Sequence, residues 1–496
     1  MEELGRGGRL RGDAAGELVA AAYAAESAHG PRLARGLSLA DLAHAVALVE
    51  GGDLSGDDAR SLLRGLLELH EIPGDEFPWD PSLGDAFNAR EAELERRVGR
   101  SAAGWLSAGR PRREAFRVAL RLTARARVRD LHDALAQQAA ALAAHARATK
   151  GALATDYTYL QPAQPTTVGH LLLAYAFPAL RDADRARRAH ASLGTSVAGA
   201  GGSAGSRWAL DRERLAGLLG CETVVEHTKD AAWQTDVYVD LLATLAIAAT
   251  HQSELGQDFE IYASQEFGLV ELADAHSRAS ALMPQKKNPY ALAAIRTQAA
   301  QAAGDVAAAL VALHTGSART DHFHLLNGTV PRALDEAVSI ARLTASVLDG
   351  IELRTERFDE IARESFVTAA DVADVLALTG ELDYRSAHKV VGRAVRDLVE
   401  TGEPPSQLTP ERLAAAAETA IGRSVELDEA TLREALDPAA CVAARRQTGS
   451  SSEPAMAEML DGIDTTLAAH ASWSETARER EAAAETALLA RARELT

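Results

Sequence analysis

The polar segment from Ser280 to Pro289, SALMPQKKNP, carries the residue types best suited to chemistry. It lies between two long stretches of helical character, and small residues lead into it, a composition that allows a loop to close over a substrate. Lys286 and Lys287, with the adjacent Asn288, favour an anionic ligand. Pro289 predicts the start of a helix, whose N-terminus also favours negative charge. The alternative interpretation is a solvated basic loop followed by a helix.

A second polar segment, TYLQPAQPTTVGH, spans residues 158–170. Its hydroxyl, amide and imidazole groups could line a pocket, and they belong to Thr158, Tyr159, Gln161 and His170. They surround a predicted helix start at which Thr166 can act as the N-cap. Alone, this segment is weak evidence for a site.

Two further motifs have a structural interpretation that we prefer. The glycine-rich stretch at 199–205 fits the loose dinucleotide-binding pattern, but a polar helical segment precedes it instead of a strand. We therefore expect a loop between two helices. The DHFH motif at 321–324 offers metal ligands, but no third ligand has suitable spacing. We expect a polar loop there that lines a pocket, with Arg319 as a carboxylate clamp.

These segments must be positioned by long helices. Alanine and leucine dominate the chain, and aromatic residues are only 4% of it, which predicts an all-α fold. Apolar residues recur at helical spacing in the longest stretches, and at 1.5 Å per residue the first three would be about 40–60 Å long. Long helices bury an apolar stripe most simply in an extended bundle, and alanine-rich faces predict packing beyond one chain. The predicted helices span 111–150, 166–192 (kinked at Pro178), 227–255, 289–315 and 331–348.

The 496 residues are too many for one ordinary domain. Shorter segments, broken by glycine and proline, flank the long stretches. We therefore predict an N-terminal helical domain (1–108), a central long-helix bundle (109–364) and a C-terminal helical domain (365–496).

Composition excludes several classes of protein. The net charge of −19 argues against nucleic acid or an anionic membrane as a partner. No apolar run approaches the roughly 20 residues that cross a bilayer, and the N-terminus lacks the apolar stretch of a signal peptide. The two cysteines, Cys221 and Cys441, exclude a disulfide framework and favour the cytoplasm.

Taken together, the two polar segments resemble the argininosuccinate lyase-like branch of the fumarase/aspartase superfamily. ASALMPQKKNP is similar to the signature loop of that superfamily, and YTYLQPAQPTTVGHLLLAY to a second region of the branch. Near the C-terminus, FVTAADVADVLALTGELDYRSAHKVVG also resembles it. The resemblance implies a homotetramer with a central twenty-helix bundle, active sites shared by three subunits, and no metal or organic cofactor.

The resemblance also implies roles for individual residues. Members of the superfamily remove a proton from a succinyl group and release fumarate. Ser280 becomes the general base, acting as an alkoxide when the loop closes. Lys286 and Asn288 would hold the carboxylate on which charge develops, and hydrogen bonds from Thr158 and Gln161 would assist them.

This chain departs from the branch at the residues that act on the leaving group. Tyr159 replaces a histidine that commonly pairs with a glutamate, and Ala293 stands at the position of that glutamate. In the SRNDQ motif of the branch only Arg112 matches, and its SDRD motif reads Trp233-Gln234-Thr235-Asp236 here. The active-site residues for proton abstraction therefore look retained, and those that recognise the arginine portion of the substrate look replaced.

The leading hypothesis is a carbon–nitrogen lyase that cleaves an N-substituted aspartate to fumarate and an amine, or catalyses the reverse addition. The alternatives are argininosuccinate lyase itself, a cycloisomerase of the superfamily and a non-catalytic structural protein. The candidate catalytic residues are Ser280, Lys286, Tyr159 and His170. The candidate substrate-binding residues are Thr158, Gln161, Asn288, Arg112, Arg319, Trp233 and Gln234.

Overall fold

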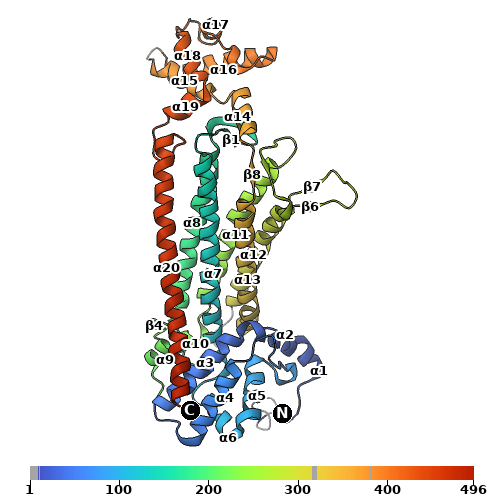
Figure 1. Cartoon of the computed structure of the whole chain (residues 1–496), viewed down its shortest axis with the longest axis vertical. Coiled ribbons are helices and arrows are strands. Elements are labelled where there is room, and N and C mark those ends of the chain that lie inside the picture. The colour runs from blue at the N-terminus through green and yellow to red at the C-terminus, as the bar shows by residue number, and fades with distance from the viewer. Residues whose placement is uncertain (1–8, 10–11, 315–320, 380–381) are drawn as a thin grey trace.

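Long helices running side by side form the middle of the molecule (Figure 1). The computed structural model describes residue 9 and residues 12–314, 321–379 and 382–496. The all-α fold predicted from the sequence is confirmed. The long central helices are α7 (Arg112–Ala148), α8 (Val168–Leu193), α11 (Asp236–Tyr262), α12 (Tyr290–Leu313) and α13 (Asp321–Asp349).

Shorter helices surround the lower end of this bundle (Figure 1). The N-terminal part of the chain forms most of them, and α9 and α10 come from the connection between α8 and α11. They are α1 (Gly16–Leu18), α2 (Ala24–Ser27), α3 (Gly30–Glu50), α4 (Gly56–His70), α5 (Ala86–Val98), α6 (Arg100–Ala103), α9 (Arg212–Leu218) and α10 (Thr228–Trp233).

A second group of short helices forms the upper end, and one long helix connects it to the bottom. From the upper group, α20 (Glu453–Glu494) runs down beside the bundle, so that the C-terminus lies at the lower end, among the helices of the N-terminal part (Figure 1). The last part of the predicted C-terminal domain therefore packs against central and N-terminal helices. The upper group comprises α14 (Thr355–Glu364), α15 (Ala369–Leu378), α16 (Tyr384–Thr401), α17 (Pro410–Ile421), α18 (Glu429–Leu436) and α19 (Pro438–Ala444).

The strands of the described residues are short and occur in four pairs. β1 (Leu153–Thr158) and β2 (Gln161–Thr167) form an antiparallel hairpin between α7 and α8. β6 (Arg278–Ala279) and β7 (Lys287–Asn288) form the base of a loop that projects from the bundle (Figure 1). The remaining pairs are β3 (Thr195–Ser196) with β4 (Thr223–Val224), and β5 (Val270–Glu271) with β8 (Glu352–Leu353).

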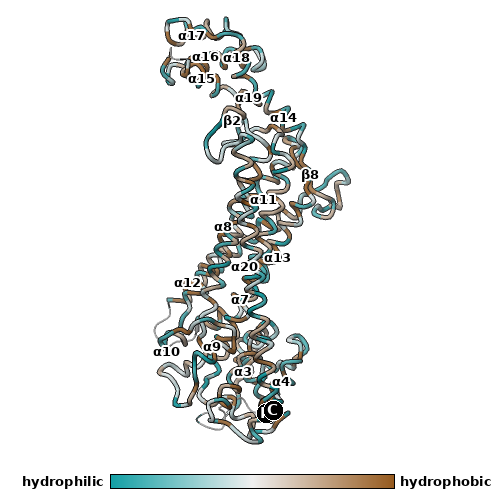
Figure 2. The backbone as a smooth tube through the Cα atoms, turned by 60° about the vertical axis from the view of Figure 1, so that its left-hand side comes forward, coloured by the Kyte–Doolittle hydropathy of each residue, from teal (hydrophilic) through white to brown (hydrophobic). Residues whose placement is uncertain are grey.

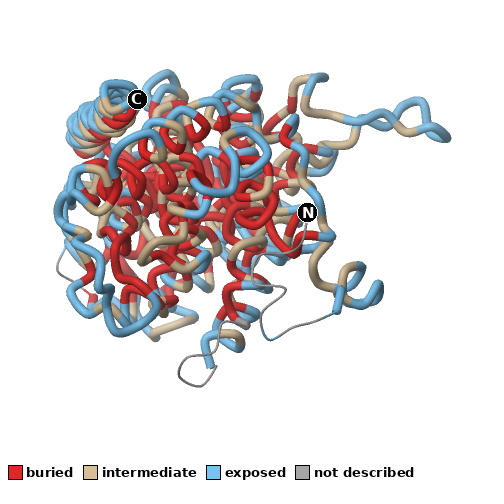
Figure 3. The backbone as a smooth tube through the Cα atoms, turned by 90° about the horizontal axis from the view of Figure 1, so that it is seen from below, coloured by how far each residue is buried: buried red, intermediate tan, exposed pale blue. Residues whose placement is uncertain are grey.

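Apolar residues fill the interior along the whole length of the molecule. Hydrophobic and hydrophilic positions alternate around the long helices in Figure 2, as expected for helices that bury one stripe. The buried segments lie at the centre of the view in Figure 3, and the exposed β6–β7 loop extends well beyond them. None of the described helices has the length and apolar character needed to span a membrane.

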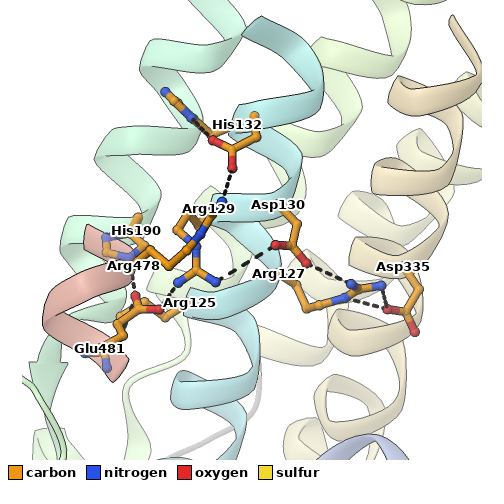
Figure 4. Close-up of polar contacts among 10 residues, drawn as sticks. Arg125, Arg127, Arg129, Asp130, His132, His190, Asp335, Arg478 and Glu481 are labelled. Atoms are coloured by element: carbon orange, nitrogen blue, oxygen red, sulfur yellow. Dashed lines mark hydrogen bonds and ion pairs between the residues drawn. The ribbon is translucent and has the colours of Figure 1, made fainter. Parts of the chain in front are cut away.

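A polar seam joins α20 to α7 and α8 (Figure 4). Glu481 of α20 accepts a hydrogen bond from Arg129 of α7 and lies 3.4 Å from Arg125 Nε. It also lies 2.7 Å from His190 Nε2 of α8. Farther along the seam, His132 Nε2 and His470 Nδ1 are 2.8 Å apart. The seam fixes the long return helix against the bundle by directional polar contacts.

Two helix boundaries differ from the sequence-based expectation. The predicted helix at 227–255 is two helices, α10 and α11, because the side chain of Gln234 accepts a hydrogen bond from buried Arg121 at the break between them. The helix expected from 331 begins at residue 321 and continues through Pro331, so the DHFH motif is helical and not a loop. A proline inside a helix removes one hydrogen bond, which packing over 29 residues offsets here.

Candidate active site

The β6–β7 ladder joins the two ends of the loop that bears Ser280. Arg278 pairs with Asn288, and Ala279 pairs with Lys287. The side-chain amide of Asn288 also donates to the carbonyl of Arg278 at 2.8 Å. The tip is solvent-exposed, and Leu282 is 86% accessible.

Ser280 lies in a tight turn that directs two backbone N–H groups at its hydroxyl oxygen. Its Oγ accepts hydrogen bonds from the backbone N–H groups of Leu282 at 3.3 Å and Met283 at 3.0 Å. Two amide donors aimed at one oxygen stabilise an anion on that oxygen, as in an oxyanion hole. The serine side chain and the tight turn that follows it produce this geometry locally.

The two lysines of the loop have different environments. Lys287 Nζ lies 2.8 Å from Asp274 and 3.0 Å from Glu271, and both carboxylates raise the pKa of Lys287. Lys286 is exposed and makes no ion pair with any described residue. Lys286 is therefore the lysine whose charge is available to a ligand.

The β1–β2 hairpin presents Thr158 and Gln161 as the last pair before its turn. The two turn residues, Tyr159 and Leu160, have φ angles of 53° and 57°. This left-handed conformation favours glycine or asparagine, and it costs about 1–3 kcal/mol for other residues. The Tyr159 side chain is fully exposed. The strained turn thus places a phenol at the outermost point of the hairpin.

His170 stands at the start of α8 with both ring nitrogens engaged. Nδ1 lies 3.0 Å from Thr166 Oγ1, and Nε2 lies 3.1 Å from the carbonyl of Gly449. Because a carbonyl only accepts, Nε2 carries the proton, and Nδ1 accepts from the threonine hydroxyl. In one chain His170 therefore connects the hairpin, α8 and the segment before α20.

Arg112, Trp233 and Gln234 lie at the opposite end of the bundle. Arg112 is 3.2 Å from Asp85, and Gln234 accepts from Arg121. Trp233 lies beside the guanidinium groups of Arg113 and Arg117, at 5.6 and 5.5 Å from their central carbons. Arg319 is outside the described residues.

One chain therefore does not bring the candidate residues together. They form three groups: the 280–288 loop, the 158–161 hairpin with His170, and the lower group around Trp233. α7 separates the hairpin from Arg112, and its 37 residues span about 55 Å. A single site could combine these groups only if they came from different copies of the chain.

Sequence reasoning missed Arg117 and the strained turn. Arg117 is only 4% exposed on α7, and a cationic residue among the apolar positions of that helix was the available signal. The turn at Tyr159 and Leu160 contains neither glycine nor asparagine, so no residue type indicated positive φ angles. Among the described residues, no group of three or more His, Cys, Asp or Glu side chains is arranged to hold a metal ion.

Comparison with known proteins identifies the family. The family described as "Lyase" matches residues 34–304, and "Argininosuccinate lyase C-terminal" matches residues 366–443. The chain belongs to this lyase family. It is 32% identical to the argininosuccinate lyase of Methanoculleus marisnigri over 476 residues, 95% of this chain and 94% of the relative. It is 35% identical to that of Halobacterium salinarum over 437 residues, 86% and 87% of the two chains.

Solved structures share the fold. EDDS lyase in complex with formate superposes with a TM-score of 0.87 at 24% identity, over 98% of this chain and 96% of that one. A 3-carboxy-cis,cis-muconate lactonizing enzyme from Pseudomonas putida gives a TM-score of 0.68 at 20% identity, over 89% and 95%.

Proposed function

We propose that this protein is a carbon–nitrogen lyase that cleaves an N-substituted aspartate to fumarate and an amine, or catalyses the reverse addition. The observation that carries the proposal is the Ser280 oxygen with two amide donors on an exposed loop beside Lys286. Relatives 32–35% identical to this chain are named argininosuccinate lyase, which supports the same class of reaction.

In the proposed reaction, Ser280 as an alkoxide takes a proton from the methylene carbon of the succinyl group. The electron pair moves into the neighbouring carboxylate and gives a dianion. It then returns to form the double bond of fumarate, the C–N bond breaks, and the nitrogen keeps the bonding pair and takes a proton. Lys286 and Asn288 would stabilise the dianion, with hydrogen bonds from Thr158 and Gln161.

A serine hydroxyl is a very weak base in water, so the proposal requires that its surroundings stabilise the ionised form. The amides of Leu282 and Met283 supply two fixed dipoles. The cation of Lys286 and the loss of water on closure strengthen this stabilisation. Tyr159 is the candidate acid for the leaving nitrogen, because its exposed phenol lies beside Thr158 and Gln161.

We further propose a homotetramer in which three subunits contribute to each site, because the three groups of residues are far apart in one chain. The surface of α12 supports an assembly. Exposed residues at alternating spacings of four and three form a stripe of small and apolar side chains, as in a helix–helix seam: Ala293, Thr297, Ala300, Gly304, Ala307 and Val311. Val311 is 77% exposed in the single chain.

The cysteines support a location in the cytoplasm. Cys221 and Cys441 are both free thiols. Burial raises the pKa of Cys221, and burial with the nearby Asp371 raises the pKa of Cys441 to about 12, which disfavours the reactive thiolate of both. Unpaired, inert thiols are typical of proteins in reducing compartments.

The second candidate is argininosuccinate lyase itself, which the names of the relatives favour. Incubation of the purified protein with a panel of N-substituted aspartates, argininosuccinate included, tests both candidates through the ultraviolet absorbance of fumarate. We expect fumarate from at least one member of the panel and slow release from argininosuccinate. Rapid turnover of argininosuccinate would select the second candidate, and no fumarate from any member would contradict both.

A further inference from the structure

A groove lies where α20 runs past α3 and α7 (Figure 1). Its volume is about 450 Å³, within the range of pockets that hold small molecules. Two residues at the end of α9, Leu218 and Leu219, complete the lining. The described residues that line the groove include no candidate catalytic or substrate-binding residue.

The groove lies on the side of α7 that faces away from Trp233. At 3.6 residues per turn, Leu122, Ala126 and Arg129 share the face of α7 that borders the groove. Arg117, which lies 5.5 Å from the ring centre of Trp233, projects from nearly the opposite face. The groove is therefore distinct from the lower group of candidate residues.

The inner surface of the groove is apolar. Five leucines from four segments line it, and three of them are buried. Small side chains, among them Ala126 and Ala482, leave the space beside the leucines unfilled. Such a surface favours an apolar group over water. The leucines are Leu39, Leu122, Leu218, Leu219 and Leu488.

Close contacts between the helices limit how far the groove can narrow. A Cβ added at Gly36 of α3 would lie 2.6 Å from the carbonyl oxygen of Ala119 on α7. A Cβ added at Gly220, just after α9, would lie 2.8 Å from the Cβ of Ala484 on α20. Closer approach of α3 or α20 is blocked at these points, so the packing of the walls maintains the space.

Arginines surround the apolar surface. Six of the residues that line the groove are arginines, and five carboxylates pair with them, which leaves one positive charge in excess in a chain of net charge −19. Several of these pairs belong to the polar seam (Figure 4). The arginines are Arg32, Arg35, Arg125, Arg127, Arg129 and Arg478, and the carboxylates are Asp130, Asp133, Asp335, Glu481 and Glu485.

Arg35 is the arginine whose head group is both at the groove and open to solvent. Its side chain is 74% exposed, and its one hydrogen bond to a described residue runs from Nη2 to Glu485, at 2.6 Å, which also lines the groove. Arg32, one turn earlier on α3, donates instead to Asp335, which does not line it. A guanidinium has five N–H donors, so Arg35 keeps donors for an acid group.

We propose that the groove binds an organic acid with an apolar body, whose acid group contacts Arg35 and whose body covers the leucines. The leucines disfavour a small inorganic ion, and the arginines disfavour a neutral or cationic molecule. The bound acid would bridge α3 and α20 and so stabilise the return helix. The proposal goes beyond the lyase reaction, and its test does not depend on that reaction.

The test uses octanoate, octanamide and acetate, since octanamide lacks the charge and acetate lacks the apolar chain. Their binding to the full-length protein is measured by calorimetry. We expect octanoate to bind at least about 10-fold more tightly than octanamide, the lower end of the value of a hydrogen bond to a charged group. Acetate should bind at least about 100-fold more weakly than octanoate. Octanoate should also raise the thermal midpoint, because it binds the folded chain.

Two pairs of variants locate the site. Arg35→Gln should bring octanoate and octanamide to equal affinity, and Arg32→Gln is the matched control that should keep the preference. Ala482→Trp should fill the groove and abolish binding of octanoate. Ala483→Trp is its control, because Ala483 is also exposed on α20 but does not line the groove.

Several results would overturn the proposal. Equal binding of acid and amide by the wild type would exclude recognition of the charge, and a preference that survives Arg35→Gln would exclude Arg35. Equal losses in Ala482→Trp and Ala483→Trp, or binding that survives Ala482→Trp, would exclude the groove. Weaker binding in Lys286→Met would place octanoate at the proposed active site. A changed mass of Ala482→Trp in light scattering would make a second copy of the chain the occupant.

Discussion

At the scale of single residues, the proposed reaction requires negative charge on one oxygen, Ser280 Oγ. Ser280 receives two backbone N–H groups, and Lys286 lies in the same loop without an ion-pair partner among the described residues. Lys287, although adjacent in sequence, forms ion pairs with Asp274 and Glu271. The sequence could identify the loop from its residue types, and the family resemblance selected Lys286, but the ion pairs that distinguish Lys287 were not predictable. That difference depends on carboxylates 13 and 16 residues earlier.

Ser280→Ala should lower kcat/KM by at least about 100-fold, the lower end of what a positioned base contributes, without loss of fold. Lys286→Met should also be severe. The double variant should be little worse than either single one, because the lysine acts partly by making the serine ionisable. Lys287→Met is the matched control and should have a smaller effect on steady-state rates. Turnover near that of the wild type in Ser280→Ala would contradict the assignment of the base.

Leu160→Gly should stabilise the protein by about 1 kcal/mol, because glycine adopts a positive φ without the steric cost that leucine has. Thermal unfolding measures the change. Leu378→Gly is the control, since Leu378 is also exposed but ends a helix, where glycine brings no such gain. A lower midpoint for Leu160→Gly would show that the hairpin turn is not strained.

At the scale of elements, regular periodicity made the long helices predictable. Tertiary contacts determine the break between α10 and α11 and the position of α20, which periodicity could not predict. α7, α8 and α12 begin and end within about two residues of the expected limits, because proline and glycine mark their ends. The break between α10 and α11 was not predictable, since it depends on Arg121, more than a hundred residues away. The position of α20 depends in the same way on its polar seam with α7 and α8.

That seam should make stability depend on pH. Burial lowers the pKa of His190, and burial with the neighbouring His132 lowers that of His470. The unfolded chain therefore binds protons more readily than the native one, so the stability is fully present above pH 6.5 and falls as the pH drops through that value. Thermal unfolding between pH 7.5 and about pH 5 measures the fall.

His470→Gln should reduce this loss of stability at low pH, because it removes one of the buried groups that resist protonation. His388→Gln, on the exposed surface of α16, should leave the profile unchanged. An identical pH profile in the wild type and His470→Gln would show that the pair of histidines does not contribute.

At the scale of the whole molecule, the sequence indicated an oligomer from its alanine-rich helices, but one chain cannot display the assembled site. The exposed stripe on α12 is the candidate interface between chains. Apart from the backbone of its own helix and its chain neighbours, a Cβ added at Gly304 would meet no atom within 4 Å, although glycine inside a helix costs about 1 kcal/mol relative to alanine. In the proposed assembly, close approach of another chain would account for a glycine there.

Gly304→Leu should therefore leave the single chain folded and break the assembly. Light scattering should change from about 210 kDa, four chains of 52.4 kDa, toward the mass of one chain or two. Gly217→Leu, at another open glycine in a helix, is the control and should retain the wild-type mass. A Gly304→Leu protein that keeps both mass and activity would remove α12 from the interface.

The central claim is that separate copies of the chain complete each active site, and mixing two variants, each changed at one proposed site residue, tests it most directly. Ser280→Ala and Gln161→Ala chains are dissociated together, reassembled and assayed for release of fumarate. If the two residues of a site come from different subunits, about a quarter of the sites in the mixture contain neither change, and activity returns to about that fraction of the wild type. The matched control mixes Ser280→Ala with Lys286→Met, which lie on one loop and should not restore activity. No recovery in the first mixture, with the tetramer reassembled, would contradict the account.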